Sequence, residues 1–276
     1  MSRNGGPSAP LRDDNSYSLS AVRSKFIATV LAGFLTFIMY GTGMAQNAPV
    51  LTPVHTKAVY PVYRATQLPA LQADWADPAW EHIPPLVITF PMGEPPHFVP
   101  HALARVLYDD DFLYVQFRVE DRYVRSVVQH VNGPVSGDAC VEFFFCPDTS
   151  KPDTYFNMEV NAGGTPLLFC VTYPWKSKVE LDSAEIRSIP LAHTMPEVIE
   201  PEITDPVTWG IEYKIPFALL EKYTPVVRPA PGVVWNANFY KTANKNSNPH
   251  YLTWSYVDFP RPNFHLPNYF GRLEFK

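Results

Sequence analysis

The sequence predicts an all-β fold: a two-sheet antiparallel β-sandwich of the jelly-roll or immunoglobulin-like kind, with one short helix near residues 216–222. Aromatic residues (14%) and 30 prolines stand against only 18% charged residues, a balance typical of strands and long loops. From residue 103 onward, apolar side chains recur with period two. The sequence shows neither an alternating βαβ pattern nor an internal repeat. A sandwich is therefore favoured, and a closed barrel is the alternative.

The first two strands are predicted to form a hairpin. Residues 112–120 alternate most regularly, with Leu113, Val115 and Phe117 on one face and polar or aromatic neighbours on the other. Three aspartates, residues 109–111, separate this segment from an apolar run at 102–108. A short polar connection of this kind closes an antiparallel hairpin.

The same alternation predicts the remaining strands. In residues 156–161, Met158 has the parity of Phe156 and Val160 and is expected in the core. Pro216 is expected to open a short helix that runs through Glu221. The further predicted strands are 140–145, 167–173, 209–215, 233–241, 252–255 and 271–275.

The N-terminal region predicts export. Arg23 and Lys25 precede an uncharged run at residues 26–40, and small residues follow it, so residues 1–45 resemble a signal peptide cleaved after Ala45. The run is shorter than the ~20 residues of a membrane span, although an uncleaved anchor remains the alternative. We expect a secreted or periplasmic chain without a membrane segment after cleavage. Residues 46–65 are interpreted as a leader, and residues 66–276 as one domain.

Charge and cysteine content exclude several classes of function. Four of the 22 basic and two of the 27 acidic residues precede residue 46, which leaves the mature chain at −7. No basic cluster supports a nucleic-acid partner. Cys140 and Cys146 would lie ~20 Å apart on one strand, so a disulfide, if one forms, would use Cys170. The eight histidines form no zinc motif.

Several short segments occur in the order found in family 9 carbohydrate-binding modules, and the chain resembles that family over about residues 66–276. None is diagnostic alone, but their order makes the resemblance fairly specific. The segments are WADPAW at 75–80, RVLYD at 105–109, FLYV at 112–115, DACVE at 138–142, WGIEYKIP at 209–216, WS at 254–255 and PNYFGRL at 267–273.

The resemblance implies a β-sandwich that binds sugar on one face, contains calcium in its loops, lacks catalysis and assists a glycoside hydrolase. Family members clamp a sugar ring between two aromatic residues, whose positions correspond here to Val135 and Phe264. The family's motif glutamate is kept as Glu142, whereas its arginine position falls at Glu159. These departures indicate a different ligand or a lost site.

Sugar recognition requires flat aromatic faces and polar groups that bond hydroxyls. We expect an oligo- or polysaccharide ligand held by polar strand positions and late-loop aromatics; Trp75, Trp80 and Trp209 are assigned to the core instead. The candidate ligand-binding residues are Glu142, Asn157, Glu159, Asn161, Trp175, Trp254, Phe264 and His265.

Three alternatives accompany this prediction. Asp109, Asp111 and Asp121 are weak calcium candidates, since hard oxygens suit that ion, but a solvated turn explains Asp109 and Asp111 equally well. Glu142 and Glu159 could serve as the carboxylate pair of a glycoside hydrolase. A related sandwich type binds haem through Met and His; the core position expected for Met158 argues against it, and no haem is expected.

Overall fold

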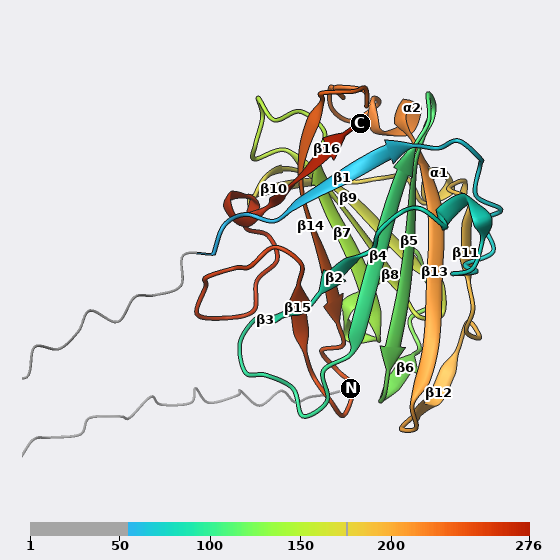
Figure 1. Ribbon diagram of the computed structural model, residues 1–276. Coiled ribbons are helices and arrows are strands. Elements are labelled where there is room, and N and C mark those ends of the chain that lie inside the picture. The colour runs from blue at the N-terminus through green and yellow to red at the C-terminus, as the bar shows by residue number, and fades with distance from the viewer. Residues whose placement is uncertain (1–54, 175) are drawn as a thin grey trace, which may run out of the picture. The chain divides into compact units, whose positions relative to one another are not determined.

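The computed structural model describes residues 55–174 and 176–276 (Figure 1). The predicted cleavage site after Ala45 and the candidate Trp175 lie outside these residues. Within them, no helix has the length and apolarity needed to cross a bilayer.

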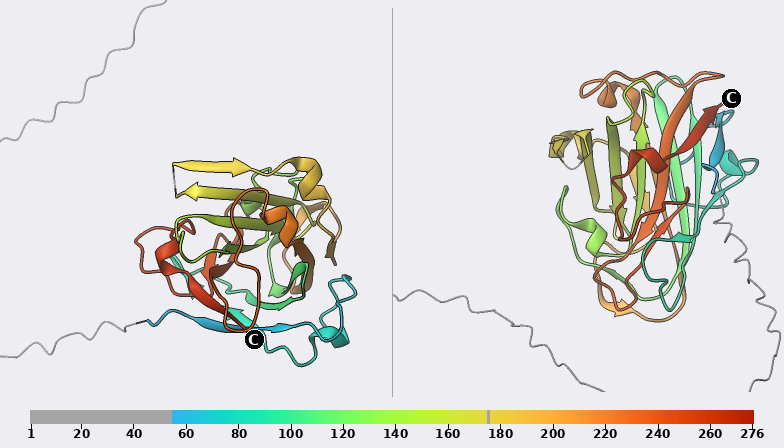
Figure 2. Two further views of the ribbon diagram at one scale, coloured as in Figure 1. Left: turned by 90° about the horizontal axis from the view of Figure 1, so that it is seen from above. Right: turned by 90° about the vertical axis from the view of Figure 1, so that its left-hand side faces the viewer.

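One long, curled sheet provides both layers of the sandwich. Its strand order is β10-β9-β8-β7-β14-β16-β1-β4-β5-β13-β11, with three short strands attached at the sides. Seen from above, the yellow strands β9 and β10 lie on the side opposite the blue strand β1 (Figure 2, left). The first layer therefore runs from β10 to β16 and the second from β4 to β11, and we call these the first and second sheets.

The strands of the first sheet are mostly antiparallel neighbours. Its bounds are β7 Cys140–Cys146, β8 Tyr155–Asn161, β9 Pro166–Tyr173, β10 Ser177–Glu180, β14 Val234–Thr242 and β16 Gly271–Phe275, with β15 Tyr251–Thr253 beside β14 and β3 Phe90–Pro91 beside β15. The predicted strands of this sheet are confirmed within one or two residues.

The second sheet contains the predicted hairpin. Its strands are β4 His101–Tyr108, β5 Phe112–Asp121, β13 Val207–Pro216 and β11 Leu191–His193, with β2 Leu86–Ile88 beside β4. A separate pair consists of β6 Val124–Ser126 and β12 Ile199–Ile203.

The interpretation of residues 46–65 as a leader is wrong for its last part. Val59–Arg64 forms β1, which pairs in parallel with β16 and then with β4 and so connects the two sheets. Tyr60 and Val62 are buried in the main core. Pro61 obscured this strand, because proline disfavours central strands. The strand tolerates Pro61 because β1 pairs with β4 only at its last two residues, Tyr63 and Arg64.

The described residues contain two short helices where one was predicted. The predicted helix is α2, Phe217–Leu220, and the additional helix is α1, Ser183–Arg187. In α1, the Asp182 side chain caps the backbone N–H groups of Ala184 and Glu185. Three 3₁₀ turns occur at Pro78–Trp80, Val135–Gly137 and Pro267–Tyr269.

The apolar faces of both sheets meet in one core. Phe143, Met158 and Phe239 belong to it, as the alternation predicted for Met158. Phe143 stacks on Phe239 with ring centroids 4.5 Å apart. Trp209 and Trp80 are fully buried, as expected, and Trp75 is half-buried.

Residues 66–85 cover part of the outer face of the second sheet. Trp80 Nε1 donates to Glu212 Oε1 at 2.9 Å, and the Arg105 guanidinium lies over the Trp75 ring at 3.7 Å. Arg105 also donates to Gln116 and to the backbone oxygen of Trp80. These bonds hold the covering segment against that sheet, so the polar groups beneath it serve the fold.

The three cysteines are free and buried. Cys140 and Cys146 lie on the outer face of β7, whereas Cys170 points into the core. No disulfide therefore links any of the three.

Candidate functional site: a cleft with two opposed carboxylates

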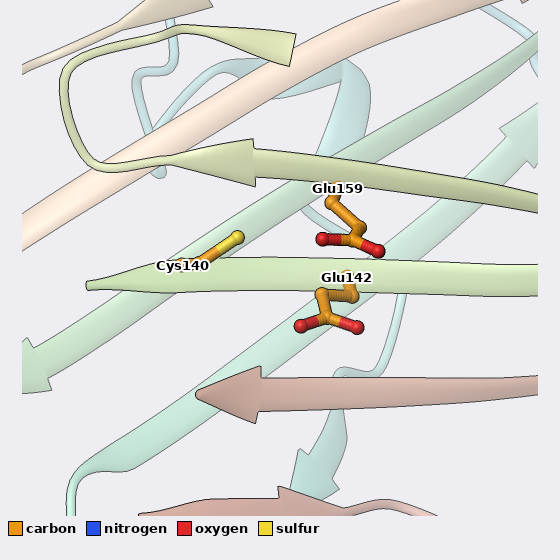
Figure 3. Close-up of side chains that lie close together, drawn as sticks. All are labelled: Cys140, Glu142 and Glu159. Atoms are coloured by element: carbon orange, nitrogen blue, oxygen red, sulfur yellow. The ribbon is translucent and has the colours of Figure 1, made fainter. Parts of the chain in front are cut away.

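Two glutamates face each other on the outer surface of the first sheet. Glu142 of β7 is the register partner of Glu159 of β8. Side chains alternate along a strand, and partners in an antiparallel pair share a face, so the core positions of Phe143 and Met158 place both glutamates on the opposite side. Figure 3 shows the two carboxylates and the Cys140 thiol directed into the same small region.

The glutamates lie at the floor of a cleft of about 180 Å³. The cleft is formed by β7, β8, β14 and β15, by the ends of neighbouring loops and by the segment 262–265 between β15 and β16. Its lining residues are Ser136, Glu142, Phe144, Glu159, Thr242, Asn244, Tyr251, Pro262, Asn263, Phe264 and His265. Of the candidate residues, the structure thus brings together Glu142, Glu159, Phe264 and His265.

Aromatic side chains form one wall of the cleft. Phe264 stacks on Tyr240 with centroids 4.0 Å apart, and the Tyr240 hydroxyl donates to the Phe264 backbone oxygen at 3.1 Å. Tyr251 meets the edge of Phe264. The Tyr155 hydroxyl lies 2.8 Å from His265 Nδ1, which fixes the loop next to the sheet.

Burial makes this an unusual place for two acids. Glu142 is 2% exposed and Glu159 is 8% exposed. Burial, together with the Glu159 charge, raises the pKa of Glu142 well above its usual range. Burial also raises the pKa of Glu159 to about 7, although a hydrogen bond from Asn157 Nδ2 at 3.1 Å opposes the shift. Burial therefore favours the protonated form of both acids.

Membership of a family is decided by the sequence match across this region. The model of carbohydrate-binding family 9 matches residues 91–275, about two thirds of the chain. The chain belongs to this family. No curated protein matches it.

Solved structures show the same fold as this family 9 chain. A candidate carbohydrate-binding protein from Bacteroides uniformis is 23% identical, with a TM-score of 0.72 over 80% of this chain and 100% of that chain. A family 9 module from Caldicellulosiruptor kristjanssonii in complex with cellotriose is 14% identical, with a TM-score of 0.53 over 79% of this chain and 94% of that chain. Its glucose complex gives the same identity and TM-score over 78% and 95%. The β-sandwich prediction is confirmed.

Two candidate asparagines have different surroundings in the family 9 chain. Asn161 is buried and fully engaged: its Nδ2 donates to Asp138 Oδ2 and Val128 O, and its Oδ1 accepts from Thr165 N. It holds the β8–β9 turn and does not line the cleft. Asn157 lies beside Glu159, and its Oδ1 has no hydrogen-bond partner among the described residues.

The structure does not bring Trp254 to the cleft. Its ring packs in the main core, edge-on to Phe239 with centroids 5.7 Å apart and close to Tyr60. Gly271 allows this packing, because an added Cβ would lie 2.7 Å from the indole. The expected ligand contact of Trp254 is therefore not supported. Val135, at the family's clamp position, is buried in a small cluster with Cys140 and Phe169.

The three calcium candidates do not converge on one site. Asp109 Oδ1 accepts from the backbone of Asp111 and Phe112, and its Oδ2 accepts from the Tyr114 hydroxyl. Asp121 lies at the other end of β5, roughly 30 Å away. There its carboxylate lies 3.2 Å from Lys241 Nζ, where a calcium ion would be repelled. The three aspartates therefore do not form one common calcium site.

Several lining residues escaped the sequence reasoning. Thr242 lines the cleft, and Tyr240 lies behind its Phe264 wall. Both are on the outer face of β14, the same side of the sheet as the glutamates, because they pair with Cys140 and Glu142. Their parity was visible in the sequence, but the neighbour relation between β14 and β7 was not. Residues 136, 244 and 263 reach the cleft from loops. Loops have no apolar periodicity from which the sequence could predict their course.

Proposed function

We propose that this family 9 chain is an exported, non-catalytic carbohydrate-binding protein that holds one sugar unit of an oligo- or polysaccharide in the outer-face cleft. The supporting observation is a pair of directly opposed carboxylates beneath an aromatic wall. Carboxylates accept hydrogen bonds from sugar hydroxyls, and aromatic side chains cover the apolar side of the ring. The cleft is smaller than the ~300 Å³ lower bound of most small-molecule pockets, which suits a single unit.

The placement of the carboxylates supports binding over hydrolysis. A glycoside hydrolase flanks the scissile bond with its two acids. Glu142 and Glu159 lie side by side on one sheet surface, so they approach a ligand from the same side. A binding site needs no more than this arrangement. A reducing-sugar release assay on every bound glycan is expected to detect no product.

A glycan array or affinity-gel screen of the mature chain tests the proposal. We expect modest affinity for at least one neutral glycan. Glu142→Ala removes a carboxyl group that bonds a sugar hydroxyl, worth about 1 kcal/mol, and is expected to weaken binding about fivefold. Phe264→Ala removes part of the wall and is expected to weaken binding as well.

The matched control is Glu81→Ala, an exposed glutamate beside the second sheet. It is expected to bind as the unchanged chain does. Thermal melts of all variants separate loss of binding from loss of folding. The absence of any glycan ligand, or full binding by both cleft variants, would contradict the proposal.

We also propose that the chain is exported and that it assists a glycoside hydrolase. The N-terminal segment supports export, and N-terminal sequencing of the protein recovered outside the cytoplasm is expected to begin at Gln46. A partner glycoside hydrolase acting on the bound glycan is expected to release more product when this chain is present.

A further inference from the structure

Three potential metal donors converge at the floor of the cleft. The Cys140 sulfur, a Glu142 oxygen and a Glu159 oxygen all lie within 4.8 Å of one another, and all three residues are buried (Figure 3). Cys140 and Glu142 come from alternate positions of β7, and Glu159 comes from the facing position of β8. The fold itself thus fixes the arrangement.

The hydrogen bonding around this cluster is deficient in donors. Glu142 makes no hydrogen bond or ion pair with the residues that the structure describes, although it is 2% exposed. Glu159 accepts one bond, from Asn157, whose own Oδ1 lacks a partner. A buried acceptor without a donor costs free energy, more so when it is charged. The two glutamates line the cleft, so a cation that enters it can contact both carboxylates.

No side chain of the described residues supplies that cation by contact. Lys241 neighbours Glu142 along the sheet, but its side chain points to the core, where its Nζ lies 3.2 Å from Asp121 and 2.7 Å from His250 Nε2. Among the described residues, Lys178 acts on Glu159 only through its charge. A cation in contact with the pair would therefore be one that enters the cleft, either an ammonium group or a metal ion.

The sulfur favours a metal ion. An ammonium group would use the oxygens alone, since a thiol is a weak acceptor. A thiolate with two carboxylates is instead a donor set for a borderline divalent ion. We propose that Cys140, Glu142 and Glu159 form a binding site for one divalent metal ion of the zinc class.

Binding replaces protons with the ion. The proton of the Cys140 thiol and any proton on the two carboxyl groups are released to solvent, and the two positive charges of the ion offset two of the three negative charges of the ligands. Glu142 and Glu159 line the cleft whereas Cys140 lies beneath it, so further coordination of the ion would occur from the cleft side. Water or a ligand hydroxyl is suited to that position. This inference goes beyond the proposed sugar binding and is measured without glycan.

Equilibrium dialysis of the chelator-treated, full chain against Zn²⁺ tests the site. We expect one ion per chain and a rise in the melting temperature with Zn²⁺ concentration. Co²⁺ in place of Zn²⁺ is expected to give a thiolate-to-cobalt charge-transfer band. Since the loss of an outer-shell partner alone weakens metal affinity about 10- to 100-fold, Cys140→Ser and Glu159→Gln are expected to weaken it by at least that much.

Cys146→Ser is the matched control, because Cys146 lies on the same face of β7 without the carboxylates. It is expected to keep both the stoichiometry and the cobalt band. If Cys140→Ser does not fold, Glu159→Gln and the band of the unchanged chain still decide the question. Binding of clearly less than one Zn²⁺ per unchanged chain would overturn the proposed site. An equal loss of zinc affinity in Cys140→Ser and Cys146→Ser would overturn it as well. Binding of glucosamine without any metal would assign the pair to an ammonium ligand instead.

Discussion

At the scale of single residues, His250 is the buried group with the clearest consequence for stability. Its Nε2 lies 2.7 Å from Lys241 Nζ, its Nδ1 contacts Asn248 O, and Asp121 pairs with the far side of the ammonium. Burial and the Lys241 charge lower the pKa of His250 to about 2. In the folded protein His250 therefore stays neutral at pH values below ~6.5, where the same side chain is protonated in the unfolded chain.

We expect the contribution of His250 to the free energy of unfolding to fall as the pH decreases below ~6.5. At this side chain the unfolded state then binds more protons than the folded state, which amounts to about 1.5 kcal/mol between pH 6.5 and 5. Urea denaturation at several pH values measures this loss. Relative to the unchanged chain, His250→Gln is expected to gain stability as the pH falls from 6.5 to 5, with slopes that differ by up to one proton. Identical slopes for the two proteins would contradict the assignment.

At the scale of secondary-structure elements, β1 determines where the domain begins. It bridges β16 and β4, and its Tyr60 and Val62 side chains fill the core. A chain that starts at residue 66, the boundary predicted from the sequence, loses this bridge and exposes both edges. We expect it to aggregate or to melt at a clearly lower temperature than a chain starting at residue 55. Circular dichroism melts compare the two, and equal melting temperatures would show that β1 is dispensable.

At the scale of the whole molecule, a buried ion pair joins the sheets. Asp121 of β5 and Lys241 of β14 meet at 3.2 Å in the interior, and Trp209 Nε1 also donates to Asp121. Lys241→Met leaves the Asp121 charge without its partner and is expected to cost about 3–5 kcal/mol. Adding Asp121→Asn is expected to recover a large part of that loss. Denaturant titrations of the single and double variants give the coupling free energy between Asp121 and Lys241. If the losses in the free energy of unfolding add up, the pair is not coupled.

The sequence by itself determined the features that depend on local periodicity. The parity of residues 140–145 and 156–161 put Glu142 and Glu159 on polar faces and Met158 in the core, because successive side chains of a strand point to opposite sides. The order of short segments along the sequence also indicated the family. Local patterns of this kind need no knowledge of the partner strand.

Only the tertiary structure decided which polar faces meet. The β7–β8 register set Glu142 opposite Glu159, and the β14–β7 pairing brought Tyr240 and Thr242 to them. The same packing placed Trp254 in the core, paired Asp121 with Lys241, and made β1 a bridge despite Pro61. These outcomes depend on contacts between segments distant in sequence, which period-two alternation does not encode, since it specifies the face of a side chain and leaves its neighbour open.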